Sequence, residues 1–247
     1  WDCTLECRNG KSPSLRLGLR QIKGMRQAAA DRISAARGQS ALRDVQDLAR
    51  RAGLDRHDLA VLAEANALRG LAGHRHRARW EVAAAEKPAP GLALPAPEHA
   101  EDFSIRPPSQ ADDTRADYAS TGLTLGPHPV AQLRAILKNR RALPARELCC
   151  KPHGSLVRAC GLITMRQRPM TASGTVFLTL EDESGYVNAV IWPRLFEKQR
   201  AEILGSQLLA IDGVMETDGD VHHLIANRVH DFSELAAGLR SRSRDFC

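Results

Sequence analysis

Apolar residues in the N-terminal part of the chain recur at the three- and four-residue spacing of amphipathic helices. Ile22, Met25 and Ala29 follow this spacing, and the stretches "VQDLARRAGL" and "DLAVLAEANALRGL" continue it. Side chains three and four positions apart share one face of a helix, so the pattern predicts helices from residue 15 to about residue 80. Residues 86–116 are rich in proline and acids and show no periodicity, which predicts a linker.

From residue 155 to residue 232 the pattern changes to the two-residue alternation of β-strands. "SLVRACGLITMRQR" is one predicted strand, and "VFLTLEDE" and "YVNAVIWP" form a predicted hairpin. A short helix, "FEKQRAEILG", separates this hairpin from a second one, formed by "LLAIDGVMET" and "VHHLIANRVHDF". Five strands with a helix between the third and fourth are typical of the OB-fold barrel. The sequence therefore predicts an α+β chain with a helical region, a linker and a five-stranded barrel.

The charge of this 247-residue chain is unevenly distributed. The net charge is +6, but residues 1–80 carry +8, and residues 128–153, where a short basic helix is predicted, carry +5. Basic excess confined to particular segments favours a polyanionic partner, and nucleic acid is the first candidate. Residues 154–247 carry −2, which argues against strong nonspecific DNA binding by the barrel.

Cysteine spacing and hydropathy argue against a zinc-binding, a membrane-spanning or a secreted protein. The six cysteines include no two C-x-x-C pairs at zinc spacing, so we expect structural cysteines in a reducing, cytoplasmic compartment. No apolar run reaches the ~18 residues of a membrane span. The start, "WDCTLEC", lacks the apolar core of a signal peptide. Because the first residue is Trp1 and not Met, we expect a processed chain or a fragment.

An acidic run, residues 181–183, joins the two strands of the first predicted hairpin. Two-metal catalysis needs carboxylates held together on a rigid sheet, but consecutive strand residues point to opposite faces, and Gly185 suits a tight turn. We interpret the run as a solvated turn and expect that neutralising it leaves DNA binding intact. His222 and His223 lack a third ligand at regular spacing, so the sequence predicts no catalytic and no metal site.

Aromatic and basic residues of the predicted barrel indicate a surface for single-stranded DNA. Phe177 and Trp192 stand on the two hairpin strands, and Arg158, Arg166 and Arg168 stand on the first strand. OB-folds bind single strands by stacking bases on exposed aromatic rings beside basic side chains. The alternative is that both aromatic residues are ordinary packing residues of the barrel, and the pattern leaves both interpretations open.

A second candidate DNA contact lies in "LRQIKGMRQAAADRI". An apolar turn, then Lys23 and Gly24, then a helix would direct backbone N–H groups at a phosphate, and Arg20 and Arg26 flank the turn. An ordinary helix–helix turn is the alternative interpretation. The stretch "LARRAGLDRHDLAVLAEA" also resembles a helix-turn-helix regulator, which would bind one duplex sequence far better than others.

Six motifs together resemble the C-terminal third of bacterial C-family DNA polymerases, and most closely their damage-inducible, error-prone branch. They are "WDCTLE", "LRLGLRQIKGM", "DYASTGLTLGPHPV", "GLITMRQRP", "VFLTLEDESGYVNAVIWP" and the terminal "RSRDF". The resemblance implies a helix-hairpin-helix region that grips duplex DNA and an OB domain near the single-stranded template. The implied regions are an end-of-fingers segment (1–14), the helix-hairpin-helix region (15–85), a linker (86–127), a basic connecting helix (128–153), the OB domain (154–235) and a tail (236–247).

The chain departs from the family pattern in three places. Arg26 stands where the family hairpin usually has a second glycine, Ala172 and Ser173 stand where the barrel often has a lysine, and no clamp-binding pair follows Gln110. The catalytic palm lies upstream in the family and is missing here. The resemblance therefore implies a DNA-binding fragment that does not polymerise and holds no cofactor, although the parent polymerase would use Mg²⁺.

The implied role is translesion synthesis after DNA damage. The implied partners are duplex and single-stranded DNA, together with accessory proteins of a translesion complex, and no membrane. Two alternatives stay open at this point. One is a free-standing, non-enzymatic protein that binds single-stranded nucleic acid, and the other is a helix-turn-helix regulator.

Overall fold

The structure, a computed structural model, describes residues 1–6, 12–84, 104–219, 221–236 and 244–246. The chain divides into two compact units, Trp1–Leu123 and Thr124–Cys247. Each unit is described by itself below. Within the described ranges, no helix combines the length and the apolar character that crossing a membrane requires.

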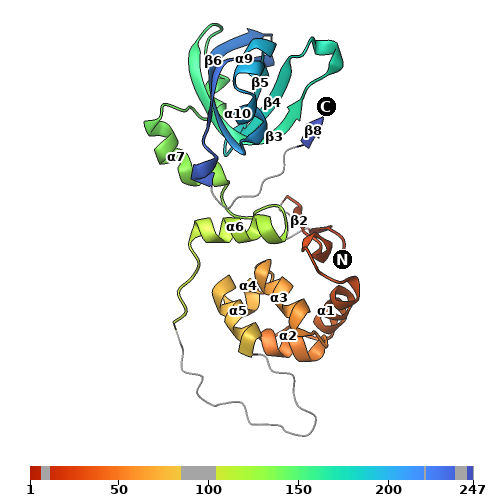
Figure 1. The fold of residues 1–247 in the computed structure, drawn as a ribbon. Coiled ribbons are helices and arrows are strands. Elements are labelled where there is room, and N and C mark those ends of the chain that lie inside the picture. Colours follow the sequence, from red (N-terminus) through yellow and green to blue (C-terminus); the bar gives the residue numbers. More distant parts are fainter. Residues whose placement is uncertain (7–11, 85–103, 220, 237–243, 247) are drawn as a thin grey trace. The chain divides into compact units, whose positions relative to one another are not determined.

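The first unit is a group of short helices preceded by a small β-ribbon (Figure 1). The ribbon pairs β1 with β2 in antiparallel register and sets Leu5 opposite Leu15. The helical region predicted for this part of the chain is confirmed. The elements are β1 (Thr4–Glu6), β2 (Ser14–Arg16), η1 (Leu19–Gln21), α1 (Gln27–Gln39), α2 (Val45–Arg51), α3 (Arg56–Glu64), α4 (Arg69–Ala72), α5 (Arg75–Ala84) and α6 (Gln110–Ser120).

Alanine makes up much of the core of the first unit. Ala29, Ala30 and Ala63 are at most 1% exposed and pack with larger residues such as Leu59 and Leu62. A methyl side chain adds little bulk and costs no side-chain entropy, so alanine-rich helices form readily and approach closely. This packing explains how a sequence with few aromatic residues builds a helical core.

Helix α6 lies inside the stretch 86–127 that the sequence predicts to be a linker. Asp113 and Asp117 on α6 form ion pairs with the guanidinium group of Arg75, which is only 1% exposed. The expectation of a chain without regular structure therefore fails for α6. Its attachment combines these ion pairs with hydrogen bonds from Lys23 to the carbonyl oxygens of Ala119 and Ser120, and apolar periodicity reveals neither. The predicted linker up to residue 103 lies outside the described residues.

The second unit is a closed, five-stranded barrel. The strands follow the order β4-β5-β7-β6-β3, and β3 closes the barrel by pairing with β4. All of these pairs are antiparallel except β5 with β7. The predicted α+β fold with an OB barrel is confirmed. The strands are β3 (Leu156–Gln167), β4 (Val176–Asp182), β5 (Gly185–Ile191), β6 (Leu208–Asp218) and β7 (Val221–Asp231).

Helices accompany the barrel before and between its strands (Figure 1). Helix α7 (Pro129–Asn139) packs Val130 and Leu137, both fully buried, against the outside of β3 and β6. Helix α8 (Ala145–Leu148) follows it. Between β5 and β6 lie α9 (Pro193–Lys198) and α10 (Arg200–Gly205), where one helix is predicted. The remaining short helical turns are η2 (Met170–Ala172) and η3 (Ser233–Ala236).

The predicted C-terminal tail contributes a further strand. Strand β8 (Arg244–Phe246) pairs in parallel with Met165–Gln167 of β3. Along Met165–Gln167 the other edge of β3 pairs with β4. The pairing of β3 with β6 extends only to Leu162. The terminal strand thus covers a strand edge that would otherwise expose unpaired backbone groups.

Candidate nucleic-acid interface

The two-residue alternation along β4 separates an inner face from an outer face of the barrel. Val176 and Leu178 are 3% and 1% exposed and belong to the barrel core. Phe177 and Thr179 are half-buried and face outward between them. On the neighbouring strand, Asn188 lies opposite Thr179 and shares that outer face.

A β-bulge decides which side chains of β3 reach the same face. The register shifts between Ile163 and Met165, so the alternation reverses beyond that point. Met165 pairs with Thr179 and faces outward as a result. Arg166 pairs with Leu178 and turns to the inner side. The sequence alone gives no sign of this bulge, so it does not show that Met165 belongs to the outer face.

A pocket of about 240 Å³ lies on this outer face. Thr179 Oγ1 donates a hydrogen bond of 3.2 Å to Asn188 Oδ1 within it. None of the residues that line it is Lys, Arg, Asp or Glu. The lining of the pocket is therefore partly polar, without an acidic side chain, a lysine or an arginine. Its principal side chains are Met165, Gln167, Phe177, Thr179, Asn188 and His223.

The predicted aromatic residues both lie outside the barrel core, at different places. Phe177 lines the pocket. Trp192 follows the last residue of β5 and is 53% exposed, outside the pocket lining. Tyr186, which sequence reasoning missed, is 63% exposed on the same strand, two residues before Asn188. Aromatic side chains thus extend along β4 and β5, as a base-stacking surface requires.

The three predicted arginines have different surroundings. Arg158 forms an ion pair with Asp212, and this guanidinium group lowers the pKa of the Asp212 carboxyl to about 2. Arg166 donates to the carbonyl oxygens of Ile203, at 2.9 Å, and Ser206, at the end of α10. Arg168 is exposed, with its guanidinium carbon 4.8 Å from the centre of the Phe196 ring.

These contacts give Arg158 and Arg166 structural roles that the sequence does not reveal, and DNA contact by any of the three arginines stays a prediction. Two other polar residues of the pocket were not predicted as site residues. Asn188 and His223 stand opposite one another on β5 and β7. The alternation of β5 marks Asn188 as outward-facing, so its position was predictable. The pairing of β5 with β7 comes from barrel closure and is invisible in the pattern.

The acidic run turns the chain between β4 and β5, but its central residue is not solvated. Asp182 is 6% exposed. Its Oδ1 accepts hydrogen bonds from the Ser184 backbone N–H at 2.7 Å and the Gly185 N–H at 3.1 Å. Its Oδ2 accepts from the Ala145 N–H at 2.8 Å, at the start of α8. The interpretation as a solvated turn is wrong for Asp182, because this residue is buried and joins the hairpin to the start of α8.

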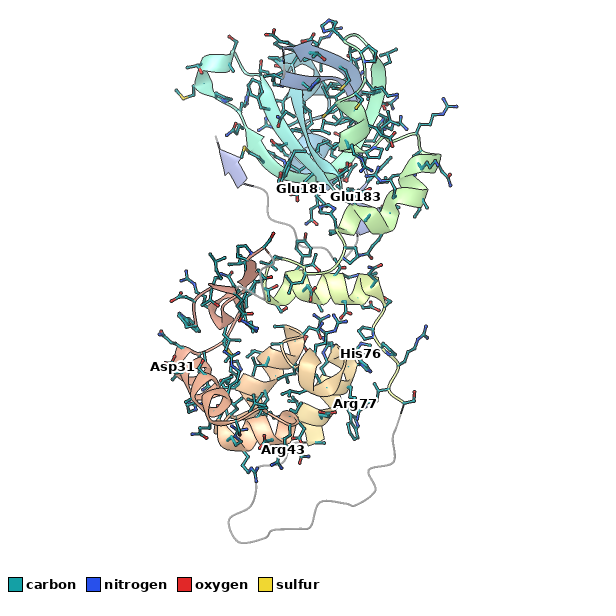
Figure 2. The ribbon with its side chains drawn as sticks, turned by 180° about the vertical axis from the view of Figure 1, so that it is seen from behind. Asp31, Arg43, His76, Arg77, Glu181 and Glu183 are labelled. Carbon is teal, nitrogen blue, oxygen red and sulfur yellow. The ribbon has the colours of Figure 1, made fainter. Side chains whose placement is uncertain are left out.

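Helix α7 supplies a cation to the same acidic run, whose residues Glu181 and Glu183 are labelled in Figure 2. Arg134 forms ion pairs with Asp182, at 3.0 Å, and with Glu183, at 2.6 Å. Glu181 faces His128 at 3.7 Å, and burial lowers the pKa of His128 despite these neighbouring acids. No group of three or more His, Cys, Asp or Glu within the described ranges could hold a metal ion. The ion pairs of Arg134 with Asp182 and Glu183 hold the hairpin to α7.

The N-terminal hairpin uses its basic side chains internally. Lys23 Nζ donates to the carbonyl oxygen of Ala119 at 2.6 Å, near the end of α6. Arg20 pairs with Asp2. Arg26 Nε donates at 2.9 Å to Asp58, which is fully buried. A double replacement of Lys23 and Arg26 would therefore alter the fold as well as the charge, and their contact with DNA stays a prediction.

The backbone of this hairpin is partly bonded within the unit, since the Lys23 N–H donates to the Ser120 carbonyl oxygen at 2.8 Å and the Met25 N–H donates to that of Ile22 at 3.2 Å. Gly24 has φ of +80°, a left-handed conformation that favours glycine, and α1 begins three residues later without a side-chain cap. By contrast, Asp55 caps α3 by accepting a hydrogen bond from the Asp58 N–H at 2.9 Å. An uncapped helix N-terminus attracts anions, whereas a carboxylate cap already occupies that position. Of the two helix starts, α1 is the one without a carboxylate cap, and phosphate binding there stays a prediction.

Comparison with known proteins adds three findings. A family profile described as "Helix-hairpin-helix motif" matches residues 1–78. The chain is 52% identical over 247 residues to an error-prone DNA polymerase of Pseudomonas fluorescens strain Pf0-1, covering 100% of this chain and 24% of that protein. It is 49% identical over 246 residues to an error-prone DNA polymerase of Pseudomonas aeruginosa, again covering 100% and 24%.

The chain thus spans about a quarter of the length of the curated relatives it matches. Among solved structures, the asparaginyl-tRNA synthetase of Pyrococcus horikoshii aligns with 37% of this chain and 22% of its own, at 18% identity and a TM-score of 0.32. That likeness is too distant to inform function. The resemblance seen in the motifs is confirmed by the whole-length similarity to the error-prone polymerases.

Proposed function

We propose that this chain, which is homologous over its whole length to a C-terminal part of error-prone DNA polymerases, is the DNA-binding part of such an enzyme. In this proposal the first unit holds duplex DNA through the hairpin before α1. The outer face of β4 and β5 holds the single-stranded template during damage-induced synthesis. Accessory proteins of a translesion complex would be further partners of the parent enzyme.

The aromatic outer face of the barrel is the observation that carries this proposal. Phe177, Tyr186 and Trp192 stand on or beside two adjacent strands of a closed OB barrel, and none of them fills its interior. Every nucleobase has a flat face, so such rings bind single strands with little dependence on sequence. The alternative of a helix-turn-helix regulator would place binding on α2 and α3 and would leave this face unused.

Single-strand binding should depend on Phe177 and Trp192. Each stacked base contributes about 1–3 kcal/mol, so Phe177→Ala and Trp192→Ala should each weaken binding of a single-stranded oligonucleotide by about tenfold or more. Fluorescence anisotropy with the full chain measures this affinity. Both side chains lie outside the barrel core, so thermal unfolding of the variants should stay close to that of the unaltered chain.

Trp80→Ala is the matched control, because Trp80 is a 50% exposed tryptophan on α5, in the first unit. The affinity of the Trp80→Ala variant for single strands should equal that of the unaltered chain. If both barrel variants fold and bind as tightly as the unaltered chain, the outer face is not the site. If Trp80→Ala alone weakens binding, the single strand is held by the helical unit.

Duplex binding should depend on the hairpin at Gly24. Alanine at a left-handed position strains the backbone by roughly 1–2 kcal/mol, which would tilt the N–H groups that lead into α1. A hydrogen bond to a charged group contributes about 1.5–3 kcal/mol, so Gly24→Ala should lower duplex affinity by about tenfold. Gly53→Ala is the control, since Gly53 has φ of +56° and precedes the capped helix α3. Equal losses in both variants would contradict the assignment to α1.

A further inference from the structure

The outer-face pocket contains polar atoms that the protein itself leaves unpaired. His223 Nδ1 is buried and has no hydrogen-bond partner among the described residues. Asn188 Oδ1 accepts from Thr179, and no partner is found in the described chain for the Asn188 amide nitrogen. Gln167 lines the same space. Buried polar atoms in proteins are nearly always paired, so His223 Nδ1 is unusual. The Asn188 side chain is exposed, so its amide nitrogen is a polar group of this face that a ligand can reach.

The lining of the pocket limits the chemistry of that ligand. Without any Lys, Arg, Asp or Glu around it, the pocket has no charge to neutralise a phosphate or an ammonium group. Phe177 provides a flat apolar wall, and Asn188, His223 and Gln167 provide polar edges. A nucleobase is a flat, neutral group with hydrogen-bonding edges, so it fits this lining and the volume of about 240 Å³.

The hydrogen bond from Thr179 fixes the direction of the Asn188 side chain. With its Oδ1 engaged at 3.2 Å, Asn188 presents its amide N–H groups to the pocket. These groups donate, so they match a base edge that accepts. Thymine has a carbonyl oxygen at ring position 4, where cytosine has an amino group that donates. The two pyrimidines are otherwise alike in size and stacking, which makes them the sharpest pair for comparison.

We propose that this pocket takes up a single unpaired nucleobase and selects thymine over cytosine through the amide of Asn188. The inference rests on the proposed single-strand binding by the barrel and adds selectivity to it. The remaining bases along the strand stack on the aromatic face without such discrimination. Binding is thus mainly sequence-tolerant, with one position that reads a carbonyl edge.

The test compares a 15-nucleotide dT strand with a dC strand on the full chain at pH 8. One neutral hydrogen bond is worth about 0.5–1.5 kcal/mol, so the unaltered chain should bind dT about three- to tenfold more tightly. Asn188→Asp keeps the side-chain shape and still accepts from Thr179, but it presents an acceptor to the base. We expect lower affinity for both strands and a reversed preference, for dC over dT. Asn188→Ala should bind both strands equally.

Each outcome separates this inference from the function on which it rests. Asn188 is exposed and makes one side-chain hydrogen bond in the described chain, so thermal unfolding should confirm that both variants fold. Equal binding of dT and dC by the unaltered chain overturns the selectivity and leaves single-strand binding intact. A preference that survives unchanged in Asn188→Asp overturns the role of Asn188. Absence of binding to either strand overturns the proposed function together with the inference.

Discussion

Replacing Arg75 with alanine is expected to lower the stability of the first unit by about 3–5 kcal/mol, which is what removing one partner of a buried ion pair costs. Arg75 pairs with Asp113 and Asp117, and its Nε donates at 3.1 Å to the carbonyl oxygen of Glu64. The variant leaves these acceptors without a cation and opens a cavity in a unit whose total stability is on the order of 5–15 kcal/mol. Helix α6 should detach first.

Arg79→Ala provides the matched control for this effect. Arg79 lies one turn along α5 and pairs with Glu64, but its side chain is 42% exposed. Exposed pairs contribute about 0–1 kcal/mol, so this variant should unfold near the midpoint of the unaltered chain. Urea unfolding, monitored by circular dichroism, measures the stability of both variants. Similar midpoints for the two variants would show that α6 is held by something other than Arg75.

The second large effect is expected at Asp182. Asp182→Asn should destabilise the barrel by about 3–5 kcal/mol. Asp182 Oδ2 accepts hydrogen bonds from the Ala145 N–H and from Arg134, and an amide NH₂ group in its place could not accept them. Glu181→Gln removes only the 3.7 Å contact with His128 and should cost about 0–1 kcal/mol. Thermal unfolding of both variants tests this contrast. Equal and small losses of stability in the two variants would contradict a structural role for Asp182 and support its interpretation as a solvated turn residue.

This expectation corrects the earlier interpretation of the acidic run. Neutralising all three acids should unfold the hairpin end of the barrel and so weaken DNA binding indirectly. The sequence suggests that this change leaves DNA binding intact, whereas the structure leads us to expect a loss. A DNA-binding loss in such a variant is informative about the site only when the barrel is shown to be folded.

The barrel was predictable because its interior depends on alternation. Val176, Leu178 and Leu180 lie inside and Phe177 outside, as the period of two requires. The succession of strands and helix along the chain followed from the lengths of the alternating runs. The outward position of Phe177 on the candidate site was therefore predictable as well.

Other parts of the candidate site depend on features without a sequence signal. The bulge after Ile163 turns Arg166 inward and Met165 outward, against simple alternation. The position of His223 beside Asn188 depends on barrel closure, which pairs strands distant in sequence. Helix α6 is held by charges on Asp113 and Asp117, so its polar sequence resembled a linker. In each case a long-range contact decides the outcome.

The central claim is that the outer face of β4 and β5 holds single-stranded DNA. Photo-crosslinking of the full chain to an oligonucleotide that carries 5-iodouracil, followed by mass spectrometry, tests it most directly. The account predicts crosslinks in peptides that contain Phe177, Tyr186 or Trp192, and their loss when an excess of unmodified single strand competes. Crosslinks confined to the first unit, Trp1–Leu123, would contradict it.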